Sequence, residues 1–424
     1  MIVMVFVKVV DVSKLVGKTA SLRGWIYRKR DQKKLVFIVL RDSTGIIQLA
    51  CKGIPEASKA TLESSIEVSG KIKKDDRAPT GFEMQVDKLK IIGLAERFPI
   101  GRDLSEEFLL DVRHLWLRSR KMTAIMKVRS TVFGAIHEFF RAKKYYEIQP
   151  PILSPVACEG ATDLFEVPYF GKKTYLSQSW QLYAEQFIQT LEKCYCIIPA
   201  FRAEKSSTSR HLSEYWTAEF EEAWADMDKG IKIGEELISF VCQRVARDCQ
   251  EELKLLERDV KEVKSIKAPF PRITYDEAVK ILKKDGKDIK WGKDLRTLEE
   301  RQLVSHYKKP LIVTHYPTAV KAFYMKLDKD PKKVLAFDML LPGSGDEVIG
   351  GAQREEDISS VASRLKKSGE DLKSYDWYLD SRRFGAVPHV GFGLGIERLI
   401  KWICGLPSLK EAIPFPRTMT RMRP

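Results

Sequence analysis

The sequence predicts an α+β protein with two domains, a small all-β barrel followed by a larger domain in which helices flank an antiparallel sheet. Up to about residue 100, short segments alternate apolar and polar residues and are separated by turn residues. From Asp111 onward, apolar residues recur at helical spacing and are followed by further strand-like segments. The chain also has 424 residues, more than one ordinary domain requires.

About five short strands are expected in residues 1–100. The apolar N-terminus, MIVMVFVKVVDV, reads as a first strand, and KLVFIVLRDSTGIIQLAC predicts two strands around a turn at residues 42–45. Two more strands are expected in IEVSGKIKKDD and GFEMQVDKLKIIGLA. Five short strands in about 100 residues are typical of an OB-fold barrel.

A hinge is expected at residues 101–110, and the second domain at residues 111–424. One long helix is predicted to begin near residue 122 and to end at Pro150 and Pro151, because proline stops a helix. Residues 265–310 are rich in lysine and are predicted to be an α-rich insertion.

Composition narrows the possible partners and the compartment. The net charge is +15 and the isoelectric point is about 9.3, which favours a polyanionic partner, although a lysine-rich solubility coat is an alternative. Seven scattered cysteines without a CxxC pair argue against structural zinc and favour reduced thiols in a cytoplasm. The apolar N-terminus is too short to span a membrane and lacks a cleavage-site pattern, so no membrane association is expected.

One short segment, FRAEKSSTSRHLSEYWTAEFE at residues 201–221, places many charges between strand-like sequences. Guanidinium groups on a hairpin suit phosphates and carboxylates, because they are planar and always charged, and a tyrosine could stack on a base. The candidates are Arg202, Glu204, Arg210, His211 and Tyr215. A solvated, salt-bridged hairpin is the alternative.

A glycine-rich segment, HVGFGLGIERLIKWICGL at residues 389–406, leads into a predicted last helix. Glycines let a backbone approach a ligand closely, and a helix N-terminus favours anions. Arg398 lies in the first turn, where a cation opposes the helix dipole, so a role toward a ligand is plausible. The alternative is a glycine-packed helix start with an exposed arginine.

A third segment, FDMLLPGSGDEVIGGAQREED at residues 337–357, carries an acid and a base in a strand-like context. Glu347 could ligate a hard divalent cation such as Mg²⁺, and Gly350 makes room beside it. Arg354 is placed to hold a carboxylate. A surface loop with an acid–base pair is the alternative.

Together these segments resemble class II aminoacyl-tRNA synthetases. FRAE…RHLSEY is similar to motif 2 (residues 194–221), GFGLGIERL to motif 3 (389–406), and the long predicted helix to motif 1 (122–151). An N-terminal OB-fold on such a core is the plan of the aspartate, asparagine and lysine subgroup. The resemblance implies ATP as a substrate, Mg²⁺ as cofactor, a homodimer formed through motif 1, and no protein nucleophile.

The resemblance also implies a role for individual residues. Arg202, Glu347 and Arg398 would be catalytic, with Glu347 holding the metal. The ATP-binding residues would be Arg202, Glu204, Arg210, His211, Leu212, Tyr215, Glu347, Gly395, Ile396, Glu397 and Arg398. The amino-acid-binding residues would be Glu159, Gln181, Ala184, Arg202, Gly350 and Arg354. Anticodon contacts would come from Arg28, Phe37, Gln48 and Glu83, with Lys29 also touching phosphate.

The substrate is inferred from positions at which this chain differs from the aspartyl enzymes of the subgroup. Aspartyl enzymes resemble QSPQLYKQ where this chain has SQSWQLYAEQ, so Ala184 stands at the position of a lysine that neutralises the substrate side chain. Together with Gly350, WICGL and IPFPRT, this resembles the asparaginyl type, of the archaeal and eukaryotic kind. The implied partners are asparagine and tRNA(Asn).

Three alternatives remain open from the sequence. The first is an aspartyl enzyme, possibly one that charges both tRNAs. The second is a tRNA-independent asparagine synthetase built on the same core, although such relatives lack the barrel at residues 1–100. The third is a non-catalytic nucleic-acid-binding paralogue, against which the intact Arg202, Glu347 and Arg398 argue.

Overall fold

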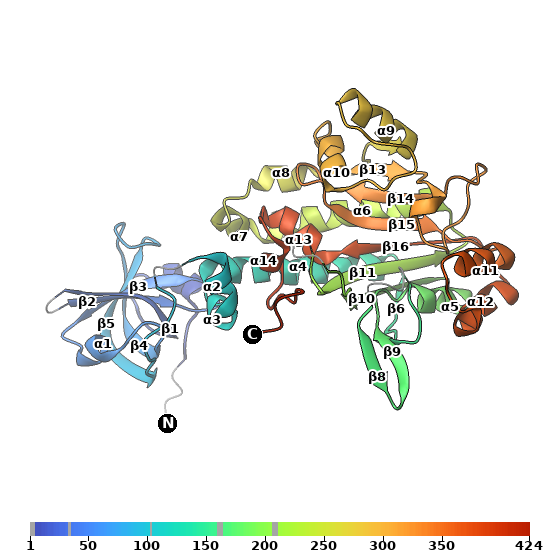
Figure 1. The fold of residues 1–424 in the computed structure, drawn as a ribbon. Helices are drawn as coiled ribbons and strands as arrows, with labels where there is room; N and C mark the ends of the chain where they lie inside the picture. Colours follow the sequence, from blue (N-terminus) through green and yellow to red (C-terminus); the bar gives the residue numbers. More distant parts are fainter. Residues whose placement is uncertain (1–4, 33–34, 102–103, 159–163, 206–210) are drawn as a thin grey trace. The chain divides into compact units, whose positions relative to one another are not determined.

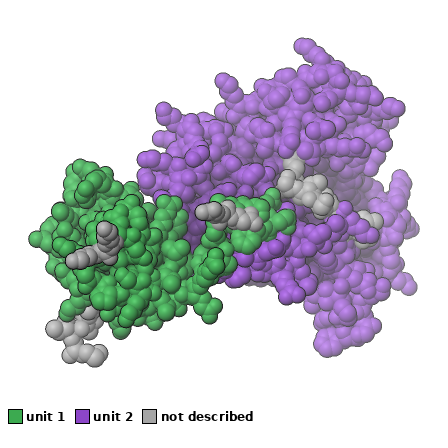
Figure 2. All heavy atoms as spheres, turned by 60° about the vertical axis from the view of Figure 1, so that its left-hand side comes forward, with its two compact units in different colours: residues 1–109 green, residues 110–424 purple. Residues whose placement is uncertain are grey.

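The computed structural model describes residues 5–32, 35–101, 104–158, 164–205 and 211–424. The chain divides into two compact units, Met1–Leu109 and Leu110–Pro424, coloured separately in Figure 2. The boundary lies at the end of the segment predicted to be a hinge. Within the described residues, no helix combines the length and apolar composition that crossing a membrane requires.

The first unit is a closed five-stranded barrel, so the predicted OB-fold is confirmed. Its strands follow the order β1-β2-β3-β5-β4. Their bounds are β1 (Thr19–Gln32), β2 (Leu35–Arg41), β3 (Ile46–Lys52), β4 (Ser65–Lys74) and β5 (Phe82–Gly93). At the predicted turn between β2 and β3, the Asp42 carboxylate accepts hydrogen bonds from the backbone of Thr44 (2.7 Å) and Gly45 (3.0 Å).

Over the described part of the N-terminus, from residue 5, the prediction of a strand is wrong. Val9–Leu15 forms a 3₁₀ helix (η1), and within residues 5–8 only Phe6 makes an isolated bridge, to Ser21. The backbone donors at the start of η1 are taken by side chains of the β2–β3 turn, because Val9 N–H donates to Asp42 (3.0 Å) and Val10 N–H to Thr44 (3.1 Å). With those donors occupied, this segment cannot add a strand ladder.

The second unit is built on an eight-stranded sheet in the order β12-β13-β14-β15-β16-β11-β10-β6 (Figure 1). The strands are β6 (Tyr146–Glu147), β10 (Lys193–Phe201), β11 (Glu214–Ala223), β12 (Arg272–Thr274), β13 (Leu311–Thr314), β14 (Ala336–Leu340), β15 (Glu347–Gln353) and β16 (His389–Gly395). Neighbouring strands are antiparallel, except that β12–β13 and β10–β6 are parallel. The antiparallel sheet that the sequence predicts therefore has one parallel pair at each edge.

Strand β11 carries apolar side chains on one face of this sheet and polar or charged side chains on the other. Ala218 and Phe220 belong to a core that also contains residues of α4 (Arg120–Ala142), α6 (Met227–Asp248) and α13 (Ile396–Cys404). Thr217, Glu219 and Glu221 alternate with them and are also buried. Because successive side chains of a strand point to opposite faces, these polar groups lie on the face away from that core.

Helix α4 ends at Ala142, well before the two prolines at which the sequence predicts its end. The chain leaves the helix at Lys144, which has a positive φ of 63°. Tyr145 N–H then donates to Phe140 O (3.0 Å), and the two rings pack edge to face with centroids 5.3 Å apart. This local contact releases the chain into β6, so the prolines follow the edge strand rather than stop the helix.

Residues 265–310 are helical as predicted, but they are not an insertion set apart from the sheet. Helices α9 (Tyr275–Lys284) and α10 (Thr297–Val304) follow β12, which is itself the edge strand of the sheet. Tyr275 and Leu303 are fully buried in a second apolar core together with residues of β13. This lysine-rich region therefore supplies an edge strand of the sheet and part of the apolar core that covers it.

Gly70 is required by the barrel. The β4–β5 register shifts between Ser69 and Gly70, and a Cβ at Gly70 would lie 2.0 Å from the backbone oxygen of Gln85. We expect Gly70→Ala to lower the free energy of unfolding by about 1–3 kcal/mol or more, measured by calorimetry of the full chain. Gly101→Ala is the control, because a Cβ there meets nothing within 4 Å. Equal melting curves for both variants would contradict the prediction.

Candidate active site

A cavity of about 570 Å³ lies in the second unit and is lined by charged side chains of the sheet together with apolar residues. The β10–β11 hairpin, β15, β16 and the start of α13 all contribute to its wall, together with residues 319–325. Of the residues predicted to bind ATP or the amino acid, those that line it are Gln181, Arg202, Glu204, His211, Leu212, Tyr215, Glu347, Gly350, Arg354, Gly395, Glu397 and Arg398. Arg210 and Glu159 lie outside the described residues.

The hairpin residues form one connected group. Arg202 follows β10, and its guanidinium lies over the Tyr215 ring at 5.7 Å and 3.6 Å from the Glu204 carboxylate. Glu204 is also 3.3 Å from His211 Nε2. Side chains that hold one another in this way are pre-positioned for a planar, negatively charged ligand, because their geometry does not have to be assembled on binding.

Arg398 is directed back from α13 toward the glycine at the helix start. A Cβ at Gly395 would lie 3.5 Å from the Arg398 side chain, and Arg398 Nη1 donates to the backbone oxygen of Glu347 (2.6 Å). The glycine-rich segment that leads into this helix is strand β16, and of its glycines Gly395 lies at the helix start.

Two neighbours of Arg398 that the resemblance assigns to ATP binding, Ile396 and Glu397, have side chains that make contacts inside the protein. Ile396 is fully buried in the helix-side core and does not line the cavity. The Glu397 carboxylate accepts hydrogen bonds from Arg129 (2.6 Å) and from Trp216 N–H (2.8 Å). Both of its oxygens are therefore used within the protein, and Glu397 ties α13 to α4 and β11.

Two carboxylates meet beside Gly350. A Cβ at Gly350 would lie 2.8 Å from Glu347 Oε1 and 3.6 Å from Asp338 Oδ1. Two oxygen donors facing one space suit a small hard cation such as Mg²⁺. Asp338 also pairs with Lys321 (2.6 Å), and its pKa is about 6, raised mainly by burial and also by Glu347, against the opposing effect of Lys321. The sequence analysis missed Asp338 and Lys321.

Glu221 and Arg354 form a buried ion pair in the wall of the cavity. Arg354 donates to Glu221 through Nε (2.8 Å) and Nη2 (3.0 Å). Burial raises the pKa of Glu221, although Arg354 opposes this rise. Gly391 makes the pair possible, because a Cβ there would lie 1.9 Å from Glu221 Oε2. Glu221 was not among the predicted site residues.

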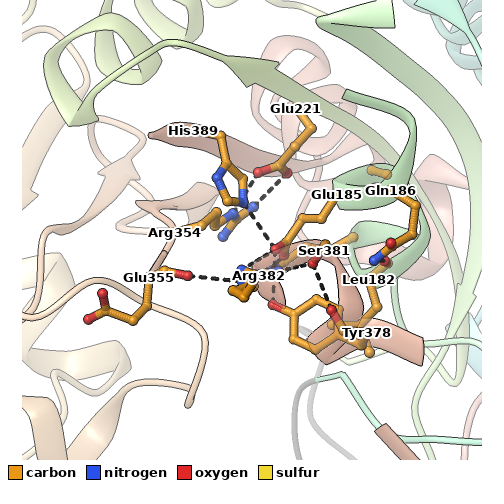
Figure 3. Close-up of polar contacts among 12 residues, drawn as sticks. Leu182, Glu185, Gln186, Glu221, Arg354, Glu355, Tyr378, Ser381, Arg382 and His389 are labelled. Carbon is orange, nitrogen blue, oxygen red and sulfur yellow. Dashed lines mark hydrogen bonds and ion pairs between the residues drawn. The ribbon is translucent and has the colours of Figure 1, made fainter. Parts of the chain in front are cut away.

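Behind this pair lies a second buried cluster, shown in Figure 3. Glu185 forms ion pairs with Arg382 and His389 and accepts a hydrogen bond from the Tyr378 hydroxyl (2.9 Å). Its other oxygen accepts from Gln181 Nε2 (2.9 Å), which connects the cluster to the cavity. The sequence analysis missed Glu185, Tyr378 and Arg382, because Glu185 and Tyr378 are 193 positions apart and nothing local shows that they meet.

The cluster is not a metal centre, although the ligand atoms of Glu185, Glu221 and His389 lie within 4.8 Å of one another. Arg354 and Arg382 already compensate the two carboxylates. His389 Nδ1 also lies 2.7 Å from a backbone oxygen, and Nε2 faces Glu185. A further cation would therefore have to displace groups whose charges and hydrogen bonds are already matched.

Ala184, which the resemblance places at the amino-acid site, packs in the core of the second unit. It is fully buried in an apolar cluster with Trp180, Ile188 and Cys194, and it does not line the cavity. Gln181 and Ala184 are three positions apart on α5 (Gln181–Leu191), so their side chains are offset by about 60° around the helix axis. Gln181 can therefore line the cavity while Ala184 packs in the core.

The predicted anticodon residues lie on the barrel. Gln48 on β3 pairs in register with Glu83 on β5, and Gln48 Nε2 donates to Glu83 (2.7 Å). Phe37 is half-buried, with Arg30 over its ring at 5.3 Å, and Arg28 is exposed. Phe37 and Gln48 share one outer face, because Gln48 opposes Val39, two residues from Phe37.

Lys29, for which the resemblance implies a phosphate contact, is engaged within the barrel. Its ammonium donates to the backbone oxygens of Ser58 (2.7 Å) and Ala60 (2.9 Å) at the end of α1 (Pro55–Lys59). Its side chain is only 13% exposed. Lys29 therefore satisfies the carbonyls at a helix C-terminus.

Comparison with known families agrees with these two units. Residues 105–419 match the class II tRNA synthetases (D, K and N), and residues 20–92 match the OB-fold nucleic acid binding domain. The chain belongs to the class II tRNA synthetases of this group. The family inferred from the three motifs is thereby confirmed.

The similar curated proteins are named asparagine–tRNA ligases. That of Thermococcus gammatolerans is 48% identical over 415 residues, covering 96% of each chain, and that of Thermoplasma acidophilum is 45% identical over 423 residues, covering 98% of this chain and 99% of the relative. The crystal structure of asparaginyl-tRNA synthetase from Pyrococcus horikoshii complexed with asparaginyl-adenylate matches with a TM-score of 0.96 at 44% identity over both full chains. An aspartyl-tRNA synthetase from Entamoeba histolytica matches at 0.86 and 25% identity, covering 99% of this chain and 93% of that one.

The Gly391 contact gives a test of the buried pair. We expect Gly391→Ala to push Glu221 away from Arg354 and to lower the free energy of unfolding by about 3–5 kcal/mol, because a buried charge loses its partner. Gly393→Ala, two residues along the same strand, is the control, since its Cβ would lie 3.6 Å from the nearest atom, in Glu219. Thermal unfolding of both variants checks this, and equal losses would contradict it.

Proposed function

We propose that this chain is an asparaginyl-tRNA synthetase, which activates asparagine with ATP to asparaginyl-adenylate and transfers it to the 3′ end of tRNA(Asn). The observation that carries the substrate assignment is the Glu221–Arg354 pair in the cavity wall. The names of the similar proteins and the adenylate bound in the Pyrococcus structure support the same assignment.

The buried pair is suited to a carboxamide side chain. An asparagine side chain has one acceptor oxygen and one donor nitrogen, and Arg354 offers donors where Glu221 offers acceptors. Arg354 uses Nε and one N–H of Nη2 to hold Glu221, so both N–H groups of Nη1 and the second one of Nη2 are left for a ligand. An aspartate side chain would instead bring a second carboxylate beside the buried Glu221, which is unfavourable.

Activation needs no protein nucleophile. A carboxylate oxygen of asparagine attacks the α-phosphorus of ATP, the bond from that phosphorus to the bridging oxygen breaks, and pyrophosphate leaves. In the transfer step, a hydroxyl of the terminal tRNA nucleotide attacks the carbonyl carbon and AMP leaves. The residues Arg202 and Arg398 would stabilise the charge on the phosphates, so positioning and electrostatics carry the rate.

Glu347 and Asp338 would hold Mg²⁺, since their oxygens converge beside Gly350. When bound, the ion would neutralise charge on the phosphates. Lys321 already lies against Asp338 and keeps this pair of acids compensated from the protein side.

Further proposals concern the tRNA, the assembly and the compartment. The barrel would bind the anticodon, with an unstacked base against Phe37 and base edges read by Gln48 and Glu83, while Arg28 would contact phosphate.

A homodimer would form through motif 1. The short edge strand β6 lies in this motif and carries Tyr146, which is 57% exposed. The seven free cysteines are consistent with the cytoplasm.

The first test is ATP–pyrophosphate exchange with asparagine and with aspartate, in the presence of Mg²⁺. We expect exchange with asparagine alone, and Arg398→Ala is expected to abolish it while leaving the fold intact. Arg383→Ala, an exposed arginine paired with Asp380, is the control and is expected to retain exchange. Exchange with aspartate instead of asparagine would refute the substrate, and normal exchange by Arg398→Ala would refute the role of Arg398.

The barrel is tested separately by Phe37→Ala. We expect this variant to aminoacylate tRNA(Asn) at least about tenfold more slowly, because a stacked base contributes about 1–3 kcal/mol, while ATP–pyrophosphate exchange stays unchanged. Trp25→Ala removes another exposed aromatic, paired with Arg41 at the other end of β2, and is the control. Equal losses of exchange and charging by Phe37→Ala would contradict an anticodon role.

A further inference from the structure

Glu185 lies between the cavity and a buried group of hydrogen-bond donors. Gln181 lines the cavity, and Glu185 follows it by one turn of α5, where i and i+4 side chains meet. Gln181 Nε2 donates to Glu185 Oε1 (2.9 Å), and both residues are at most 4% exposed. Glu185 Oε2 belongs to the cluster in Figure 3.

Two donors and one histidine nitrogen lie against Glu185 Oε2. The Tyr378 hydroxyl donates to it (2.9 Å), and Arg382 forms an ion pair with it. His389 Nε2 lies 3.1 Å away, while His389 Nδ1 lies 2.7 Å from the Val387 backbone oxygen. Because a backbone oxygen only accepts, Nδ1 carries a proton, so Nε2 faces the carboxylate either as the lone-pair nitrogen of a neutral imidazole or as the second donor of an imidazolium.

Glu185 is therefore an acceptor at both oxygens. Burial alone would raise the pKa of Glu185, but Arg382 and His389 outweigh it and hold the pKa below its usual value. An ionised carboxylate has no proton to give to Gln181. The Gln181 amide must then turn its nitrogen toward Glu185, which leaves Oε1 as its remaining polar atom. That oxygen has no hydrogen bond to any described residue.

We propose that Glu185 is a positioning residue, which fixes the Gln181 amide with its oxygen available in the cavity as an acceptor for an N–H donor of bound asparagine. The donor is either the α-ammonium or the side-chain amide, because both are N–H groups of the same ligand. The proposal rests on the proposed function, in which asparagine occupies this cavity. It extends that function by assigning a role to a residue that cannot itself touch the ligand, since it is fully buried.

Glu185→Gln gives a directional test. The donors around Oε2 require an oxygen there, so the nitrogen of the new amide must face Gln181 and reverse the Gln181 amide. A donor would then meet the donor of asparagine. We expect the KM for asparagine in ATP–pyrophosphate exchange to rise about 10- to 100-fold, the equivalent of one hydrogen bond to a charged group, while the KM for ATP changes by less than about twofold.

A double variant separates positioning from simple structural damage. In Gln181→Glu combined with Glu185→Gln, the new amide at 185 donates to the new carboxylate at 181, which offers an acceptor to the cavity as well. The total charge is unchanged. We expect this exchange of residues to recover most of the KM for asparagine. A double variant no better than Glu185→Gln, or an equal rise in both KM values, would overturn the proposal.

A third variant keeps the test decisive if Glu185→Gln does not fold. Gln181→Met removes the acceptor and leaves the buried cluster untouched, so we expect it to raise the KM for asparagine to a similar extent. An unchanged KM in Gln181→Met or in folded Glu185→Gln would overturn the proposal. If the unmodified protein shows no exchange with asparagine, the proposed function fails first, and this inference fails with it.

The donor itself is identified with succinamate, which is asparagine without its amino group. Its inhibition constant is measured against asparagine in the unmodified protein and in Glu185→Gln. A constant that rises with the KM for asparagine assigns the acceptor to the side-chain amide, and an unchanged constant assigns it to the α-ammonium. Both outcomes support an acceptor set by Glu185.

Discussion

The cavity depends on carboxylates that are buried on one face of β11 and remain compensated there. Glu219 and Glu221 are 4% and 1% exposed, which without partners would cost several kcal/mol each. Glu221 lies against Arg354, and Glu219 accepts from the Thr217 hydroxyl (2.7 Å) and from Trp180 N–H (3.3 Å). The surrounding strands and helices are arranged so that each acid finds these donors.

The same requirement explains where glycine is needed. Glu221 reaches Arg354 only because Gly391 on the neighbouring strand has no side chain, and Gly350 likewise leaves room for Glu347. A ligand in the cavity would therefore meet carboxylate oxygens and guanidinium groups of the sheet as well as apolar side chains. The opposite face of β11, with Ala218 and Phe220, has the ordinary apolar covering of helices.

The sequence predicts the parts of the site that are contiguous and misses those that are assembled from a distance. Arg202, Glu204 and Tyr215 lie within one short motif, and the cavity indeed brings them together. The partners Glu221 and Arg354 are 133 residues apart, so nothing local shows that they meet. Lys29 has the charge of a phosphate contact, but its position beside the end of α1 gives it a capping role that only the barrel geometry reveals.

Element ends were harder to predict than element types, for a related reason. The OB-fold barrel and the motif strands follow from alternation and turn residues, which are local. The end of α4 instead depends on Tyr145 packing back on Phe140, and the N-terminal segment depends on side chains of the β2–β3 turn more than 30 positions away. Both are contacts that outweigh a local preference.

The alternation of apolar and acidic side chains along β11 also fixes the register in which this strand pairs with its neighbours. A slip by one residue would move Phe220 into the cavity and bury Glu219 and Glu221 among apolar helix side chains, without Arg354. Burying these two carboxylates without a partner would cost several kcal/mol. The charges of the cavity wall therefore also hold the sheet in its pairing, so a single set of acids serves both the ligand site and the fold.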